Sequence, residues 1–429
     1  MNDNRILKTL AIRPFLFLIL AEIFSQFATN MLNFVLIIIA FTLTNSSTAV
    51  SGVILSFTIP ALLFGLLAGA YVDKWNKKKV LYAANFIRAI LVFLLIFAHS
   101  NLILIYILCF AISLVSQFFI PAETPMIPVV VKKNLLFSAN AIFGMIIYAS
   151  IFIAYALSGP LLLIFGNTGI FIVLSLAFLL AALFASLIKI QVKSPRKLMD
   201  LTRLDMNLFD ELKQIISFFR KARIIYNALF LLSLAQILVL VLAVIGPGYA
   251  EQVLGIQIEQ FPVFFVTPAV IGTAVGAILL SNYLHRHPKQ HLTRIGLFLI
   301  GFAILALPYI SKIESRDFVQ TINSYLPHAF AISILHMLVI LAFIMGLANS
   351  FIFVPSNTTL QEETSDEFRG KVYGVLNTMV GFFSLLPIIL VGGLADLIGI
   401  KSVITGIGVI VIIIGVVNYI VSRKKLMIA

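Results

Sequence analysis

Four polar side chains in the first apolar segment have the types and spacing needed to bind a proton or a polar ligand in an apolar environment. Glu22, Gln26, Asn30 and Asn33 follow one another at intervals of four, four and three residues, which places them on one face of a helix. Glu22 lies about eight residues into this segment, or roughly 12 Å at 1.5 Å per residue. Because burial at that depth disfavours the charged form of a carboxyl group, Glu22 is the predicted site of reversible proton binding.

The same four residues have simpler interpretations. Amide side chains often join apolar helices through hydrogen bonds, which would give Gln26, Asn30 and Asn33 a purely structural role. Glu22 in turn could be paired permanently with a buried base, for which Arg88 is the candidate. Arg88 itself either extends its guanidinium group to the membrane surface or makes a polar contact within the protein.

Other polar residues of the apolar segments complete the candidate site. Gln117 and Gln236 are predicted to line a substrate cavity together with the three amides of the first segment. Glu123 is expected at the membrane surface, paired with the lysines of 77–79. No pattern of catalytic residues is present, so enzyme chemistry has no support and no cofactor is expected. A metal site is not expected either, because the only clustered histidines lie beside basic residues in a polar loop, at positions 285, 287 and 291.

A glycine-rich stretch that ends in a charged loop is the second candidate region. Gly65 and Gly69 are four residues apart, so they leave one helix face open to the close approach of a neighbouring helix. Asp73 follows one turn later, among basic residues. A carboxylate held among cations at a helix end can pair in one conformation and be released in another. The alternative is an ordinary surface loop. The basic residues of this predicted latch are Lys74, Lys77 and Lys78.

The composition determines what kind of protein must position these residues. Of the 429 residues, 61% are hydrophobic and 11% are charged, which is outside the range of soluble globular proteins. The outer surface must therefore face lipid. Continuous apolar runs such as 35–41 and 409–414 exclude the alternating pattern of a membrane β-barrel. The sequence predicts an all-α membrane protein.

About twelve membrane-spanning helices in two six-helix bundles are predicted. The N-terminal bundle is expected over residues 1–188, with a turn at 166–169 between its last two helices. Residues 189–223 form a basic linker with an amphipathic helix on the cytoplasmic surface, and residues 224–429 form the C-terminal bundle. Similar spacings of glycine, proline and arginine in the two halves support an internal repeat.

The distribution of basic residues predicts the orientation. The net charge is +13, which by itself could suggest nucleic-acid binding. Of the 30 Lys and Arg residues, two lie within helices and three lie on the far side, which leaves 25 on one side of the membrane. This bias is the positive-inside pattern, so both termini are predicted to be cytoplasmic and no nucleic acid is expected as a partner. The three on the far side are Lys312, Arg316 and Lys401.

Several stretches of the chain resemble one protein family. The spacing Gly-x3-Asp-Lys-x2-Lys-Lys of residues 69–78 resembles the loop between the second and third helices of the major facilitator superfamily. Residues 118–122, 138–141 and 158–160 are similar to the region around helices four and five in its macrolide-efflux and enterobactin-exporter branch. The residues matched around helices five and ten to twelve include Gly159, Pro160, Arg369, Gly370 and Asp396.

The resemblance implies a structure and a mechanism. It implies two six-helix bundles that give access to each side of the membrane in turn. It implies that Gly69, Asp73 and the bases after it form a cytoplasmic latch against the start of helix eleven, near Arg369. It also implies export of bulky amphipathic compounds in exchange for protons.

Taken together, these features predict a secondary active transporter of the inner membrane, a proton-coupled exporter of drug-like, macrolide-like or siderophore-like molecules. Its expected partners are a small-molecule substrate, protons and the lipid bilayer, and it is expected to be a monomer. Two alternatives stay open at this point. One is an uptake permease for a metabolite, and the other is a membrane sensor or scaffold that transports nothing.

Overall fold

The computed structural model of the chain describes residues 5–72, 74–98, 100–132, 135–189, 223–284, 287–310, 333–364 and 366–426. All regular structure in these ranges is helical, as the composition predicts. Several predicted features lie outside the described residues. They are the latch carboxylate Asp73, nearly all of the 189–223 linker with its amphipathic helix, the histidine at position 285, and Lys312 and Arg316.

The contacts between residues divide the chain into two compact units. Unit 1 comprises Met1–Thr44 and Gly52–Asn207, and unit 2 comprises Asn45–Ser51 and Leu208–Ala429. The short segment Asn45–Ser51 precedes most of unit 1 in the sequence but makes its contacts in unit 2. Helix α3 (Ser47–Val72) therefore begins in unit 2 and continues in unit 1.

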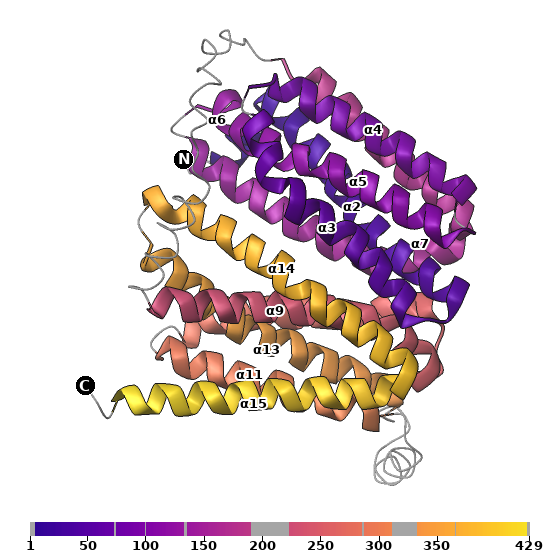
Figure 1. Cartoon of the computed structure of the whole chain (residues 1–429). Helices are drawn as coiled ribbons and strands as arrows, with labels where there is room; N and C mark the ends of the chain where they lie inside the picture. Colours follow the sequence, from indigo (N-terminus) through magenta and orange to yellow (C-terminus); the bar gives the residue numbers. More distant parts are fainter. Residues whose placement is uncertain are drawn as a thin grey trace, which may run out of the picture. The chain divides into compact units, whose positions relative to one another are not determined.

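Unit 1 contains five long helices, including most of α3, and two short helices within the described residues (Figure 1). Besides α3, the long helices are α2 (Arg13–Thr44), α4 (Lys77–Ala98), α5 (Leu102–Glu123) and α7 (Leu136–Leu187). The short helices are α1 (Arg5–Leu10) and α6 (Ile127–Val130). Helix α7 loses helical geometry at Gly166, whose φ is +63°, a conformation that glycine adopts without strain. It thus contains two spans that meet in the predicted turn.

Unit 2 combines long α-helices with π-helical turns. Its helices are α9 (Arg223–Gly248), α10 (Thr267–Leu279), α11 (Lys289–Ala306), α13 (Ile334–Glu362), α14 (Asp366–Ile398) and α15 (Ile400–Leu426). Three π-helical segments, Tyr249–Leu254, Pro262–Val266 and Leu280–Leu284, continue α9 and flank α10. Such turns widen the helix locally and often occur at functional sites.

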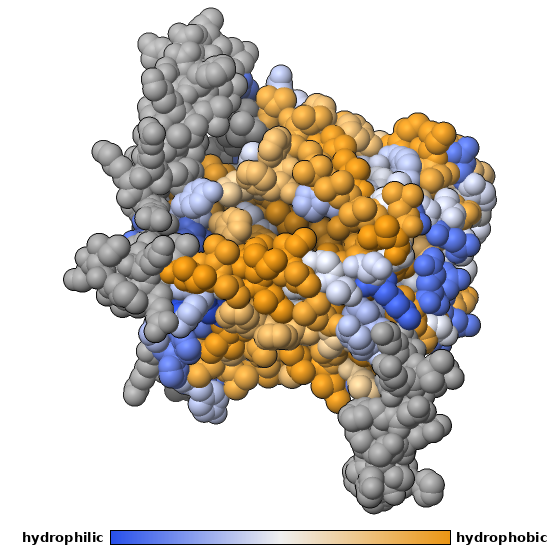
Figure 2. Space-filling view, turned by 60° about the horizontal axis from the view of Figure 1, so that its bottom comes forward, coloured by the Kyte–Doolittle hydropathy of each residue, from blue (hydrophilic) through white to orange (hydrophobic). Residues whose placement is uncertain are grey.

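The long helices have the length and composition of membrane spans. Eleven described helices are long and apolar enough to cross a bilayer, and dividing α7 at Gly166 gives the predicted count of twelve. Large apolar side chains remain exposed on both units, for example Phe97, Ile164 and Leu397. Figure 2 shows such apolar surface in orange. Lipid is the environment in which this surface is stable.

Glycines bring two helices of unit 2 into backbone contact. A Cβ atom added at Gly346 in α13 would lie 1.7 Å from the carbonyl oxygen of Ala269 in α10. A Cβ atom added at Gly272 in α10 would lie 2.0 Å from the carbonyl oxygen of Phe343. The hydroxyl of Thr273 donates a hydrogen bond of 3.0 Å to the Gly346 carbonyl. The two helices therefore pack through small residues, as membrane helices commonly do.

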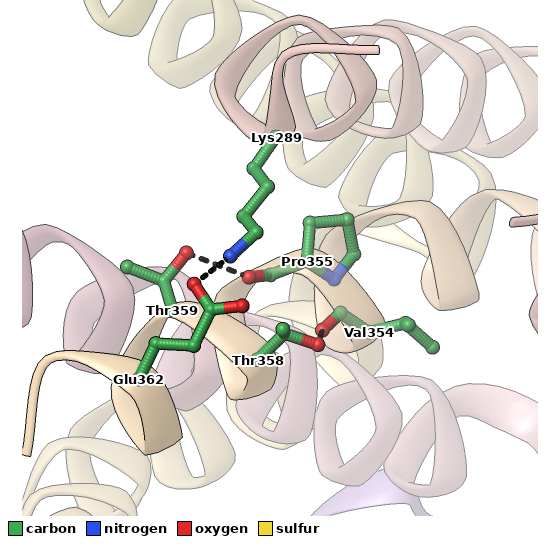
Figure 3. Close-up of polar contacts among 6 residues, drawn as sticks. All are labelled: Lys289, Val354, Pro355, Thr358, Thr359 and Glu362. Carbon is green, nitrogen blue, oxygen red and sulfur yellow. Dashed lines mark hydrogen bonds and ion pairs between the residues drawn. The ribbon is translucent and has the colours of Figure 1, made fainter. Parts of the chain in front are cut away.

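An ion pair joins the start of α11 to the end of α13 at the surface of unit 2. Figure 3 shows the ammonium group of Lys289 directed at the carboxylate of Glu362. About one turn before Glu362, Thr359 and Thr358 donate hydrogen bonds of 2.8 Å to the carbonyl groups four residues earlier, those of Pro355 and Val354. Because both charged side chains are well exposed, the pair contributes about 0.2–1 kcal/mol.

Candidate functional site

The acid and amides predicted on one face of α2 are joined by hydrogen bonds. The amide of Gln26 donates a hydrogen bond of 2.9 Å to Oε1 of Glu22. The amide of Asn30 donates to the carbonyl oxygen and to Oε1 of Gln26, at 2.8 and 3.2 Å. Glu22 is fully buried, whereas Gln26 and Asn30 are partly exposed. The chain of hydrogen bonds therefore leads from a partly exposed amide to a buried carboxyl group.

Arg88 of α4 is buried beside this face, with 2% of its surface exposed. Its guanidinium group donates hydrogen bonds to the hydroxyls of Ser25 and Thr29 in α2, at 3.1 and 3.4 Å, and to Oδ1 of Asn85 at 2.6 Å. The alternative in which Arg88 extends to the membrane surface is wrong. The reason is that α2 supplies two hydroxyl acceptors inside the unit.

Two aromatic rings complete the surroundings of Arg88. The central carbon of the guanidinium group lies 4.5 Å from the ring centre of Phe119 in α5 and 4.8 Å from that of Phe178 in α7. Such cation–π contacts stabilise a cation by about 2 kcal/mol or more where water is excluded. The hydrogen bonds described for Arg88 all end on neutral oxygens, so its charge acts on Glu22 through space.

The prediction that Glu123 lies at the surface beside the lysines of 77–79 is wrong. Glu123, the last residue of α5, is only 4% exposed. Its carboxyl group lies within hydrogen-bonding reach of the carboxyl group of Glu22, and the charge of Arg88 acts on it as well. The cause lies in the chain after α5, which folds back over this point. Met126 and Ile127 are buried in the same apolar cluster as Phe119 and Ala122.

The other predicted cavity residues are partly exposed. Asn33 in α2 and Gln117 in α5 belong to unit 1, whereas Gln236 lies in α9 of unit 2. The amide of Gln117 donates a hydrogen bond of 3.1 Å to the carbonyl oxygen of Ser113. The matched pair in helix five, Gly159 and Pro160, lies inside α7, with Gly159 buried. That these residues line one substrate cavity stays a prediction.

Unit 1 leaves space around the described glycines of the predicted latch. A Cβ atom added at Gly69 would meet no atom within 4 Å, and one added at Gly65 would meet only Oε1 of Gln117, at 3.6 Å. No helix of unit 1 therefore packs closely on these two glycines, and the close approach of a helix from the other half stays a prediction. The ring of Trp75 stacks on Phe118 with 5.9 Å between ring centres. Both rings line a groove of about 680 Å³, together with the latch base Lys74. Lys77 and Lys78 are partly exposed in the first turn of α4.

Asp396, near the end of α14, caps the first turn of α3. Its carboxylate accepts hydrogen bonds from the backbone N–H groups of Ser47 and Thr48, at 2.7 and 3.0 Å. It also accepts hydrogen bonds of 2.6 Å from the hydroxyls of Ser46 and Thr48. A carboxylate at this end of a helix satisfies free N–H groups and is favoured by the helix dipole. Of the other matched residues, Arg369 and Gly370 lie in the first turns of the same helix.

Replacing Asp396 with alanine is expected to loosen the first turn of α3. Loss of a side-chain cap typically costs about 0.5–2 kcal/mol. We therefore expect the amides of Ser47 and Thr48 to exchange hydrogen roughly fivefold to tenfold faster, measured by mass spectrometry on the purified protein. The exposed acid Glu251 provides the control, and Glu251→Ala should leave exchange at these amides unchanged. Unaltered exchange in Asp396→Ala would show that the carboxylate does not hold the turn.

The amino-acid sequence of the chain is similar to those of known transporters. The profile of the family described as Major Facilitator Superfamily matches residues 18–322 and 318–426. The chain is similar to an uncharacterised transporter of this type, YfiS of Bacillus subtilis (strain 168), with 22% identity over 399 residues, or 90% of this chain and 87% of the relative. A second relative from the same organism, YkuC, is 28% identical over 123 residues, which cover 26% of this chain and 29% of the relative.

Solved structures share the fold at lower identity. The nucleoside transporter NupG matches with a TM-score of 0.71 and 14% identity, covering 95% of this chain and 99% of its own. The POT family transporter PepTSo matches with a TM-score of 0.70 and 14% identity, covering 97% of this chain and 98% of its own. A bacterial homologue of the lysosomal transporter Spinster, inward-facing and unoccupied, also has a TM-score of 0.70 at 14% identity, covering 100% and 99%. At this identity the likeness concerns the fold alone.

Proposed function

Because this chain belongs to the Major Facilitator Superfamily, we propose that it is a secondary active transporter that exports amphipathic small molecules in exchange for protons. That it is a multi-pass membrane transporter follows from the family and from its apolar helices. The proposal adds the direction, the class of cargo and the coupling ion. It also places the chain in the inner membrane as a monomer, with both termini in the cytoplasm.

The observation that carries the proposal is the buried carboxyl group of Glu22 at the end of the Asn30–Gln26 hydrogen-bond chain. A carboxyl group in an apolar protein interior is stable when it is protonated or when a cation compensates its charge. Partly exposed amides next to it can bind the polar part of a substrate. Proton and cationic substrate then compete for one acid, which is the requirement for exchange without ATP. The drug-like, macrolide-like or siderophore-like class rests on the resemblance of residues 118–160.

The proposed cycle uses the latch as the switch between states. When Asp73 pairs with the start of α14 near Arg369, the cytoplasmic side is closed. A proton that reaches Glu22 from outside neutralises it and favours release of the latch. Alternating access then follows from a shift in population between two states, since the proton and the substrate bind them with different affinity.

Replacing Glu22 with glutamine is expected to abolish proton-driven export while substrate binding is retained, because glutamine imitates the protonated acid. A strain without efflux pumps of its own, screened for resistance to a panel of compounds, first identifies a substrate. Everted vesicles acidified inside should then leak protons when this substrate is added, and vesicles with Glu22→Gln should not.

Glu251→Gln, which changes an exposed acid, serves as the matched control and should retain the leak. Full proton-driven export by Glu22→Gln would place coupling at another residue. If no compound on the panel is exported and a metabolite is accumulated instead, the chain is an uptake permease. If neither a compound nor a metabolite is transported, the chain is a sensor or scaffold.

The orientation is tested with single cysteines. A cysteine placed in 189–223 should resist a membrane-impermeant maleimide in intact cells and react after permeabilisation, because the positive-inside bias puts this segment in the cytoplasm. The natural Cys109 is fully buried, so it adds little background. A cysteine in place of Lys312, which is predicted on the far side of the membrane, should react in intact cells. Labelling of the 189–223 cysteine from outside would show that the orientation in the membrane is the opposite of the one proposed.

A further inference from the structure

Glu22 does not stand alone in the interior of unit 1. It is fully buried, Glu123 is 4% exposed and Arg88 is 2% exposed, and the three residues come from α2, α5 and α4. We propose that Glu22 and Glu123 form a carboxyl pair that binds one proton between them, with Arg88 as its fixed counter-charge. The role of this pair in transport rests on the proposed function, whereas proton binding by the pair does not.

Unpartnered oxygens mark the place of the proton. Oε2 of Glu22 and Oε1 of Glu123 are buried and receive no hydrogen bond from any described group. The two carboxyl groups are within hydrogen-bonding reach of each other. Two ionised carboxylates at that separation repel each other and offer only acceptors. A single proton converts the repulsion into a carboxyl–carboxylate hydrogen bond and satisfies both groups.

The charge of the cluster leads to the same number of protons. With both acids ionised, the two carboxylates and the guanidinium group carry a net charge of −1 among buried side chains. With one proton the net charge is zero, which an apolar interior favours strongly. No second proton is needed for neutrality. The net charge of the cluster is therefore zero when one proton is bound and −1 when that proton leaves.

The surroundings contain no competing charge among the described residues. Helix α2 presents the neutral donors and acceptors Gln26, Ser25 and Thr29, and α4 adds Asn85 to Arg88. Helix α7 contributes the ring of Phe178. The remaining neighbours are apolar side chains of one core cluster, which includes Phe15, Leu18, Phe119, Ala122 and Met126. Arg88 and the two acids are thus the titratable groups that set the proton count.

Infrared difference spectroscopy of the purified protein, titrated between acidic and alkaline pH, measures protonated buried carboxyl groups directly. We expect one such group at neutral pH in the natural chain. Glu22→Gln and Glu123→Gln should each abolish the whole signal, because the remaining acid and Arg88 are neutral together without a proton. Arg88→Met should roughly double the signal, since both acids then need a proton to be neutral. Glu251→Gln should change nothing.

The outcomes distinguish the pair from its alternatives. If Glu123→Gln keeps the signal of the natural chain, Glu22 binds the proton alone and the pair is refuted. If each single variant removes half of a two-proton signal, the acids titrate independently and the pair is refuted again. Both glutamine variants keep the size of the side chain, and circular dichroism checks their folding. Because the titration needs no substrate, absence of proton-driven export would refute the proposed function without affecting the pair.

Discussion

Replacing Arg88 with methionine is expected to destabilise the protein by about 3–5 kcal/mol, the cost typical of removing one partner from a buried group of charges. The substitution removes hydrogen bonds to Ser25, Thr29 and Asn85 and leaves two facing acids without their counter-charge. The measurement is unfolding of the purified protein in mild detergent by titration with a denaturing detergent, followed by circular dichroism.

The chain supplies a matched control for this experiment. Arg294 lies in α11 of unit 2, where its side chain donates a hydrogen bond of 3.1 Å to the carbonyl oxygen of Gln290, and its guanidinium group lies 5.4 Å from the ring centre of Tyr419. No acid is described beside it. Arg294→Met should therefore change stability by less than about 0.5–1 kcal/mol. Equal losses in the two variants would mean that the buried acids do not depend on Arg88.

Replacing Gly346 with alanine is expected to be as damaging as the loss of Arg88, although it adds a single methyl group. The new Cβ atom would lie 1.7 Å from the Ala269 carbonyl oxygen. Because that atom belongs to the backbone, no change of rotamer relieves the clash, and α10 and α13 must separate. Overpacking usually costs about 1–3 kcal/mol, and we expect the upper end or more, measured by the same unfolding titration.

Gly393→Ala in α14 is the matched control, because a Cβ atom there would meet no atom within 4 Å. It should leave the unfolding midpoint unchanged or raise it slightly, since alanine favours helix over glycine by about 1 kcal/mol. A similar midpoint for Gly346→Ala and the natural chain would contradict the close packing of α10 on α13.

The fold could be predicted from the sequence because membrane helices are signalled by composition and length. The first apolar segment is predicted to begin about eight residues before Glu22, and α2 runs from Arg13 to Thr44. The turn between the fifth and sixth spans falls at Gly166 as predicted. Helix packing is harder, because glycines four apart lie against a neighbouring backbone at Gly272, whereas nothing in unit 1 packs against Gly69. The spacing of glycines in the sequence does not show which helix packs against them.

The candidate site could be predicted only in part, because the sequence shows local patterns but not contacts between helices. The face of α2 is a local pattern, so Glu22, Gln26 and Asn30 are found on it together. Glu123 was misplaced because its position at the end of a span suggests the surface, and only the fold of the residues after it shows that it is covered. The hydroxyls that bind Arg88, those of Ser25 and Thr29, were not predicted. They follow Glu22 by three and seven residues, which places them on the same side of α2, and this spacing is the signal that could have found them.

The order of the residues around Arg88 along the chain also affects how the protein is made. An arginine in the middle of a helix costs about 2.5–3.5 kcal/mol at insertion into the bilayer. When α4 leaves the ribosome, α2 has already been synthesised and can offer the hydroxyls of Ser25 and Thr29. Phe119 and Phe178, which cover the guanidinium group, come later. Biogenesis therefore delivers the acceptors for this charge before the rings that seal it from lipid.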